Sequence, residues 1–243
     1  MASLTTKPTL WVRDCRIPLQ HQLAMSWYAG SGLDKGHLSR REDAEWGTTR
    51  SLAHQASALT HFYTNAAPQH PGFNQRSTSD TDTWSCLERW ILERGVLKEG
   101  GKTARICIFS GPVFQDSDPV RSGVKLAVSF FKIVVWYEQG GRLRTTAWEL
   151  SQEALLRQHL ALEELQLDAL MRPDQRSLRW IADHTGLVFD RTMHETDTHR
   201  APGNAAQGNG LSEADYDALP GSLQAADPCK ARPKKSPVGA PTI

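Results

Sequence analysis

The residues with the clearest capacity for chemistry are four consecutive ones, Asp34, Lys35, Gly36 and His37. Gly36 allows the chain to turn and its backbone to approach a ligand closely, so the imidazole beside it could face solvent. A histidine side chain with its ordinary pKa of roughly 6.5 can take a proton from water at neutral pH. His37 is therefore a candidate general base, and the positive charge of Lys35 would favour an anionic substrate.

Charged residues continue beyond these four. Arg40 and Arg41 add positive charge within a few residues of His37, and Asp34 could orient either the imidazole or the backbone. The same residue types are also typical of a surface turn with a solvated histidine, followed by a charged helix start. Residue types alone favour that second interpretation over a catalytic site.

Several further blocks, which follow one another in a fixed order, favour the catalytic site over the surface turn. The stretch DKGHLSRREDAEWG (34–47) resembles the Asp-Arg-Gly-His signature of the DNA/RNA non-specific endonucleases. Six other stretches resemble blocks of the same family: WVRDCRIP (11–18), FYTNAAPQHPGFNQ (62–75), DTWSCLERWIL (82–92), FSGPVF (109–114), FFKIVVW (130–136) and RWIADHTGLVFD (179–190). The resemblance covers residues 11–195. It implies an α+β protein with the ββα-metal nuclease fold, in which helices flank a mixed, mainly antiparallel sheet.

The resemblance also implies a chemistry and the residues that perform it. His37 would be the general base, Asn74 the one direct ligand of Mg²⁺ (with Mn²⁺ as the alternative), and Glu88 an acceptor for a metal-bound water. Lys35 stands where the family has arginine, so it would attract phosphate as a point charge without the bidentate fork. The expected reaction is sequence-non-specific hydrolysis of phosphodiester bonds in DNA and RNA.

Four further residues are expected to contact the substrate. Arg40 and Arg41 are candidates for contacts with the nucleic-acid backbone, although one of them could instead form an ion pair on a helix face. Asn65 and Gln69 would reach the end of a sheet from the second block. Because these contacts would engage phosphate and sugar rather than base edges, both DNA and RNA could be substrates.

The chain departs from the family pattern in its N-terminal part and in one spacing. The family's N-terminal strand pair is expected to be incomplete here, and Thr9 occupies the place of an arginine that contacts phosphate. Asn74 and Glu88 are fourteen positions apart, more than the family keeps. An unbroken helix would separate them by roughly 21 Å, too far to share one hydrated ion. The insert RSTSDTD (76–82) is therefore predicted to loop out.

Structural alternatives remain for both residues. An isolated Asn74 would more commonly make an Asx-type turn, and Glu88 could form a capping box with Ser85. For the whole chain, one alternative is a catalytically weakened or inactive nucleic-acid-binding remnant of the same fold. The other is an unrelated interaction protein in which the DKGH stretch is a chance loop.

The hydrophobic pattern predicts the elements that must position these residues. Helices are expected over 83–95, 151–170 and 177–186, with Gly186 ending the last one, and a short helix or loop over 47–60. Strands are expected over 61–65, 104–114 and 125–138, with a bend near Ser129, and over 142–150 after a hairpin at Gly140-Gly141.

Length and composition set the boundaries of the fold. The 243 residues suit one domain, residues 1–195, followed by a mostly disordered tail, residues 196–243, rich in Pro, Gly, Ala and Asn. A basic run in this tail, 230–235, could grip phosphates weakly but is more typical of a solvated tail. Because 28 basic residues balance 27 acidic ones, any grip on nucleic acid must come from local patches.

The cysteines and the terminal segments give information on the cellular location of the protein and on its binding partners. Cys15, Cys86, Cys107 and Cys229 lack metal-ligand spacing and could be thiols or form one or two disulfides. No secretory pattern or membrane-length apolar run is visible, so no membrane association is expected. The expected location is cytoplasmic by default, or outside the cell after a non-classical route. A nuclease endangers its own cell, so an inhibitor protein is expected, and a homodimer is left open.

Overall fold

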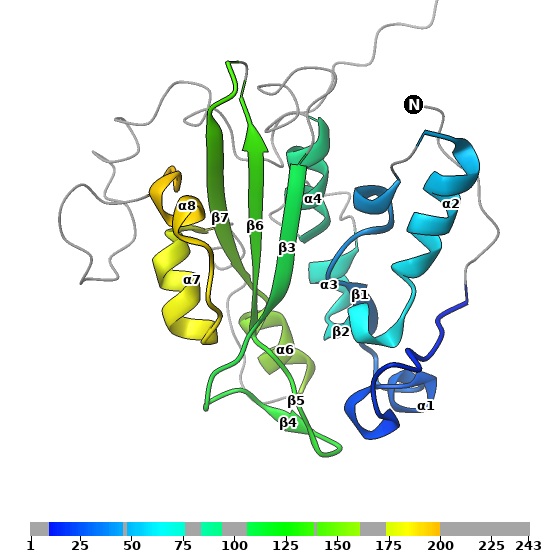
Figure 1. Cartoon of the computed structure of the whole chain (residues 1–243). Helices are drawn as coiled ribbons and strands as arrows, with labels where there is room; N and C mark the ends of the chain where they lie inside the picture. Colours follow the sequence, from blue (N-terminus) through cyan, green and yellow to red (C-terminus); the bar gives the residue numbers. More distant parts are fainter. Residues whose placement is uncertain are drawn as a thin grey trace, which may run out of the picture.

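A four-stranded antiparallel sheet forms the central layer of the computed structural model (Figure 1). Its strand order is β3-β6-β7-β8, with bounds Ile106–Val113, Ser129–Tyr137, Leu143–Ser151 and Asp174–Arg176. The structure describes residues 10–45, 48–75, 84–93, 106–138, 140–160 and 174–199. β6 lies between two long neighbours, which explains why its sequence is the most apolar run in the chain.

One face of β6 packs against the helix that follows the block FYTNAAPQHPGFNQ (62–75). Phe130 of β6 belongs to a buried cluster with Trp84, and Val134 to a cluster with Leu87, both on helix α4 (Trp84–Glu93). Successive strand residues point to opposite faces, so the even-numbered residues of β6 share this face. The face therefore carries the helix from which Glu88 projects.

The opposite face of β6 is covered by helix α7 (Leu178–Thr185). Phe131 and Ile133 pack with Leu178 and Ile181 of this helix in another buried cluster. The side chain of Ser177 caps α7 by accepting the backbone N–H of Trp180, and Gly186 ends it in the left-handed conformation (φ 70°). Figure 1 shows α7 and α8 (Arg191–Glu195) together on this side of the sheet.

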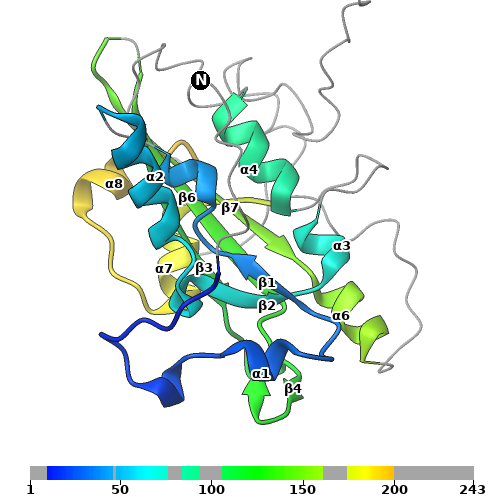
Figure 2. The same ribbon diagram turned by 90° about the vertical axis from the view of Figure 1, so that its right-hand side faces the viewer.

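A small second sheet carries the DKGH residues. β1 (Asp34–His37) pairs antiparallel with β2 (Ala66–Gln69), so that Asp34 lies opposite Gln69 and His37 opposite Ala66. The short helix α3 (Pro71–Asn74) follows β2 directly, and α4 comes next (Figure 2). This order, two paired strands followed by helix, is the ββα unit that the sequence resemblance implied.

Asn74 and Glu88 do not lie on one continuous helix. α3 ends at Asn74 because Gln75 is extended (φ −90°, ψ 152°). The ring of Phe73 nevertheless stacks on the ring of Trp84, with centroids 5.8 Å apart. The two helices are thus held together across the insert, and the loop predicted over 76–82 lies outside the described residues.

The remaining elements connect these layers. Single helical turns are η1 (Leu19–His21), η2 (Arg41–Ala44) and η3 (Tyr63–Asn65); short helices are α1 (Met25–Tyr28), α2 (Arg50–Leu59) and α6 (Glu153–His159); β4 (Val120–Arg121) and β5 (Val124–Lys125) form a hairpin. None of the helices within the described ranges has the length and apolar character to cross a membrane. Cys15 and Cys107 are exposed thiols and Cys86 is a buried one, while Cys229 lies outside the described residues.

Most predicted elements are confirmed, including the bend before β6, where residues 126–128 separate it from β5. The strand predicted over 61–65 is wrong: Tyr63–Asn65 is a helical turn and the strand begins at Ala66. The alternative of a surface turn at Asp34–His37 does not apply, because these residues are paired as β1. The helix predicted over 151–170 is α6, and 161–173 lie outside the described residues.

The described part of the chain continues past the predicted boundary at residue 195, as far as residue 199. Helix α8, which the sequence analysis did not predict, is followed by residues that return to the sheet. The backbone of Thr145 in β7 bonds to those of Thr196 and Thr198, and the side chain of Asp197 accepts the N–H of Leu178. The chain from 200 to 243 lies outside the described residues.

Gly36 is required by close packing within the small sheet. A methyl group at this position would overlap the side chain of Gln69, which is completely buried. We expect Gly36→Ala to destabilise the fold by about 1–3 kcal/mol through overpacking. The same change should cost clearly less in a Gln69→Ala background, where the clashing atoms are gone. Urea unfolding of the four proteins of this cycle measures the coupling, and equal costs in both backgrounds would contradict it.

Candidate active site

The imidazole of His37 sits in an aromatic enclosure at the end of β1. Its ring centroid is 4.5 Å from that of Trp11 and 4.9 Å from that of His61, and the two histidine rings meet edge to face. Trp11 reaches this position because Val12 forms a parallel bridge with Phe62, close to β2 in sequence. The Nε2 atom of His37 is buried and has no hydrogen-bond partner among the described residues.

This enclosure sets the protonation state of His37. Burial lowers the pKa of His37 to about 4, because the imidazolium form loses its hydration. The nearby His61 and Arg41 lower this pKa further and Glu42 opposes them. At neutral pH His37 is therefore an uncharged imidazole, the form that can accept a proton. The solvent-facing imidazole expected from the sequence is not observed.

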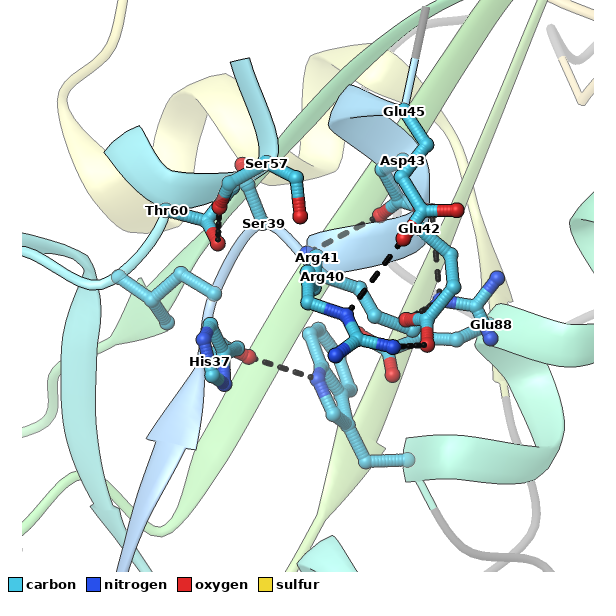
Figure 3. Close-up of polar contacts among 12 residues, drawn as sticks. His37, Ser39, Arg40, Arg41, Glu42, Asp43, Glu45, Ser57, Thr60 and Glu88 are labelled. Carbon is cyan, nitrogen blue, oxygen red and sulfur yellow. Dashed lines mark hydrogen bonds and ion pairs between the residues drawn. The ribbon is translucent and has the colours of Figure 1, made fainter. Parts of the chain in front are cut away.

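The backbone from the carbonyl of His37 to that of Leu38 is held by three polar contacts. The indole Nε1 of Trp84 donates to the carbonyl oxygen of His37 at 3.2 Å (Figure 3). The ammonium of Lys132 donates to the carbonyl oxygen of Leu38 at 3.3 Å, and the N–H of Leu38 bonds to the carbonyl of Asn65. The position of His37 thus depends on α4 and β6, elements far away in the sequence.

The side chain of Asn65 has a structural partner for each of its polar groups. Its Nδ2 donates to the carbonyl oxygens of Ser39 and Thr60, both at 2.8 Å, and its Oδ1 accepts the N–H of Ser39 at 3.0 Å. Both amide donors are occupied, so this geometry does not support the substrate contact predicted for Asn65. Its observed role is to hold the segment after β1 in place through hydrogen bonds to the backbone of Ser39.

Gln69, the other predicted substrate contact in this block, is also internal. Its side chain is completely buried against Gly36, and neither amide atom has a hydrogen-bond partner among the described residues. A substrate contact would require this side chain to reach the surface. The observed packing instead explains why Gly36, against which this side chain lies, has no side chain of its own.

Asn74 is oriented by the first residue of β1. Its Nδ2 donates to Oδ2 of Asp34 at 2.9 Å, and Nε2 of Gln75 donates to the same oxygen at 2.9 Å. An ionised carboxylate only accepts hydrogen bonds, so the amide nitrogen of Asn74 must face Asp34. Its Oδ1 accepts no hydrogen bond from the described residues and is available as an acceptor. Asp34 therefore orients the predicted metal ligand rather than the imidazole.

This arrangement fits a hydrated divalent cation. Mg²⁺ keeps several of its waters and uses few protein ligands, so one hard oxygen such as Oδ1 of Asn74 suits it. Within the described ranges, no group of three or more His, Cys, Asp or Glu side chains is placed to bind a metal. The fit is thus with a cation held largely through water, the type that the sequence resemblance implied.

Lys35 is partly buried on the same face of β1 as His37, by strand alternation. Its Nζ lies 3.4 Å from Sδ of Met25 and 5.6 Å from the ring centroid of Tyr28. No carboxylate pairs with this ammonium in the described part of the chain, so its charge is not locally cancelled. Its attraction for phosphate stays a prediction.

Arg40 and Arg41 lie among acidic side chains of the same segment (Figure 3). Nε of Arg40 is 3.5 Å from a carboxylate oxygen of Glu42 and 3.5 Å from one of Asp43. Arg41 is 3.4 Å from Glu42 and 3.5 Å from Glu45. The ion-pair alternative raised from the sequence is therefore observed for both arginines, and a phosphate would have to compete with these carboxylates.

Glu88 is buried, with only 6% of its surface exposed. Its Oε1 lies 3.2 Å from Nζ of Lys132. Burial raises the pKa of Glu88 to about 7, while the ammonium of Lys132 opposes that rise. The role of Glu88 toward metal-bound water stays a prediction, and its observed partner is a lysine.

Four residues around His37 were not singled out from the sequence: Trp11, His61, Trp84 and Lys132. Trp84 and Lys132 do carry a signal, because each lies in a block that resembles the family. Lys132 is moreover a lone charge within the apolar run FFKIVVW. A charge at an inward strand position requires partners, and this could have drawn attention to it. Trp11 carries the same kind of signal, as the first residue of the block WVRDCRIP (11–18), whereas His61 lies just outside the blocks.

Comparison with known proteins points to one family. A sequence model described as DNA/RNA non-specific endonuclease matches residues 2–194. An uncharacterised protein of Sinorhizobium fredii is 29% identical over 203 residues, covering 79% of this chain and 29% of that protein. A nuclease of Nostoc is 31% identical over 136 residues, covering 56% of this chain and 40% of its own length. Human mitochondrial endonuclease G is 24% identical, covering 54% of this chain and 42% of its own length.

A solved structure supports the fold. A chain in the crystal structure of the EndoG/EndoGI complex superimposes with a TM-score of 0.52 at 15% identity, covering 79% of this chain and 76% of that one. The chain spans less than half the length of the curated relatives named above. These matches alone therefore do not establish that it has the whole activity of any of them. The match over residues 2–194 establishes that this chain belongs to the DNA/RNA non-specific endonuclease family, and its fold is the α+β, ββα-metal fold.

Proposed function

We propose that this chain is a metal-dependent nuclease that hydrolyses phosphodiester bonds of DNA and RNA without sequence preference. The observation that carries the proposal is the state of His37, an uncharged imidazole whose Nε2 has no partner among the described residues. It lies at one end of β1, and Asp34 at the other end orients Asn74. One strand thus organises both a base and an oxygen ligand.

His37 would accept a proton at Nε2 from the water that attacks phosphorus. Asn74 would hold Mg²⁺, with Mn²⁺ as the alternative, through Oδ1, while Asp34 fixes its amide. When bound, the cation would polarise a phosphate oxygen and stabilise the negative charge that develops on the leaving oxygen. Lys35 would add positive charge beside the phosphate.

The names of the relatives bear on substrate and partner. A nuclease and an endonuclease are among them, which supports nucleic acid as the substrate. The similarity to a chain from a complex described as a mechanism of EndoG inhibition supports an inhibitor protein as a partner. Arg40 and Arg41 would contribute to binding the backbone only by exchanging their carboxylate partners for phosphate.

The direct test is digestion of plasmid DNA and of a structured RNA by the purified chain, with Mg²⁺ and with EDTA. We expect Mg²⁺-dependent loss of both substrates. His37→Ala should reduce the rate by about 100-fold or more, because it removes the general base. His54→Ala, an exposed position on α2, is the matched control and should retain activity. A folded wild-type chain that binds DNA but does not cleave it would indicate the non-catalytic remnant instead.

The buried imidazole also predicts a dependence of stability on pH. The folded-state pKa of His37 is below its unfolded value, so the unfolded chain takes up the proton first as pH falls. The stabilisation is complete above about pH 6.5 and is lost toward pH 4, by on the order of 3 kcal/mol. The pKa of His61 is lowered too, so only part of the wild-type slope belongs to His37. Urea unfolding should show a shallower decline between these pH values for His37→Gln; parallel curves would contradict the burial of a neutral His37.

A further inference from the structure

The side chain of Lys132 is completely buried in the middle of β6. Burying an ammonium group costs free energy unless it is paired and hydrogen-bonded. A methionine, similar in length and uncharged, would fill the same apolar space without that cost. The contacts that its charge makes are therefore the feature to explain.

Those contacts join three separate segments of the chain. Nζ of Lys132 donates to the carbonyl oxygen of Leu38 at 3.3 Å and to Oε1 of Glu88 at 3.2 Å. A carboxylate oxygen of Asp43 lies 3.9 Å away, with its side chain only 7% exposed. The ammonium thus connects the residue after β1, the helix α4 and the turn η2 to the central strand of the main sheet.

Trp84 acts on the neighbouring carbonyl from the start of α4. Nζ of Lys132 lies 4.6 Å from the centroid of its ring, a cation–π geometry. The indole Nε1 of Trp84 donates to the carbonyl oxygen of His37. The two consecutive carbonyls at the end of β1 are therefore bound by two side chains that also contact each other.

We propose that Lys132 and Trp84 are positioning residues for His37, which fix the end of β1 against the main sheet and thereby hold the imidazole in its aromatic enclosure. Neither is proposed to touch the substrate, and Lys132 is inaccessible to it. The catalytic part of this inference rests on the proposed nuclease function. The positional part concerns the imidazole itself, so it can be measured without any activity.

The decisive variant is Trp84→Phe, because it removes the hydrogen bond to the His37 carbonyl and keeps an aromatic ring for packing. Lys132→Met removes the charge and keeps the length of the side chain. The matched control is Thr145→Val, a completely buried position on β7 whose hydroxyl bonds to Thr196 in the segment after α8. It loses a buried polar contact in the same sheet without touching the segment around His37.

Two readouts separate positioning from a general loss of stability. The first is kcat and KM for plasmid cleavage with Mg²⁺. The second is the NMR titration of the His37 ring, assigned among the nine histidines by its disappearance in His37→Gln. The groups that also influence this ring, His61, Arg41 and Glu42, are unchanged in every variant tested.

We expect both variants to lower kcat by roughly tenfold to a hundredfold, as small displacements of a catalytic group do. KM should stay within about twofold. The pKa of His37 should move up toward its usual value, while Thr145→Val changes neither readout. If Lys132→Met does not fold, Trp84→Phe decides alone.

The proposal is overturned if folded Trp84→Phe keeps the wild-type kcat and the wild-type titration of His37. A wild-type chain without nuclease activity would refute the proposed function instead. The titration would still decide in that case whether the two residues position the imidazole.

Discussion

A single buried ammonium joins the two layers of this protein. Lys132 projects from the central strand toward the ββα unit and finds its partners there: a backbone carbonyl, two carboxylates and an indole ring. Since an unpaired buried charge is strongly destabilising, these segments are constrained to meet at one point. The sheet, α4 and the end of β1 are therefore placed relative to one another by polar contacts as well as by apolar packing.

The consequence for chemistry is that the candidate base depends on the fold as a whole. β1 is only four residues long and belongs to a two-stranded sheet, which is marginally stable without support. Its support comes from α4, from β6 and from Asn65 after α2. Trp11, brought in by the N-terminal segment, completes the enclosure that keeps His37 uncharged at neutral pH.

The sequence predicted the elements better than the roles of individual side chains. Hydrophobic periodicity located the central strands and α4, and the blocks identified His37 and Asn74 as candidate residues. It could not show that Gly36 is required by Gln69, because that contact joins two strands 33 positions apart. The structural bonds of Asn65 and the ion pairs of the two arginines likewise depend on tertiary contacts. The burial of His37 was missed for the same reason: residue types do not reveal a covering ring such as Trp11.

In the proposed function, β1 brings a metal ligand and a base together as one site. Paramagnetic broadening of histidine NMR signals by small amounts of Mn²⁺ tests this directly, since the effect falls steeply with distance from the ion. We expect selective broadening of the His37 ring in the wild-type chain. Asn74→Ala should abolish it, whereas Gln75→Ala, whose side chain bonds the same Asp34 oxygen, should retain it. Broadening that misses His37, or that persists without Asn74, would contradict a shared site formed by these two residues.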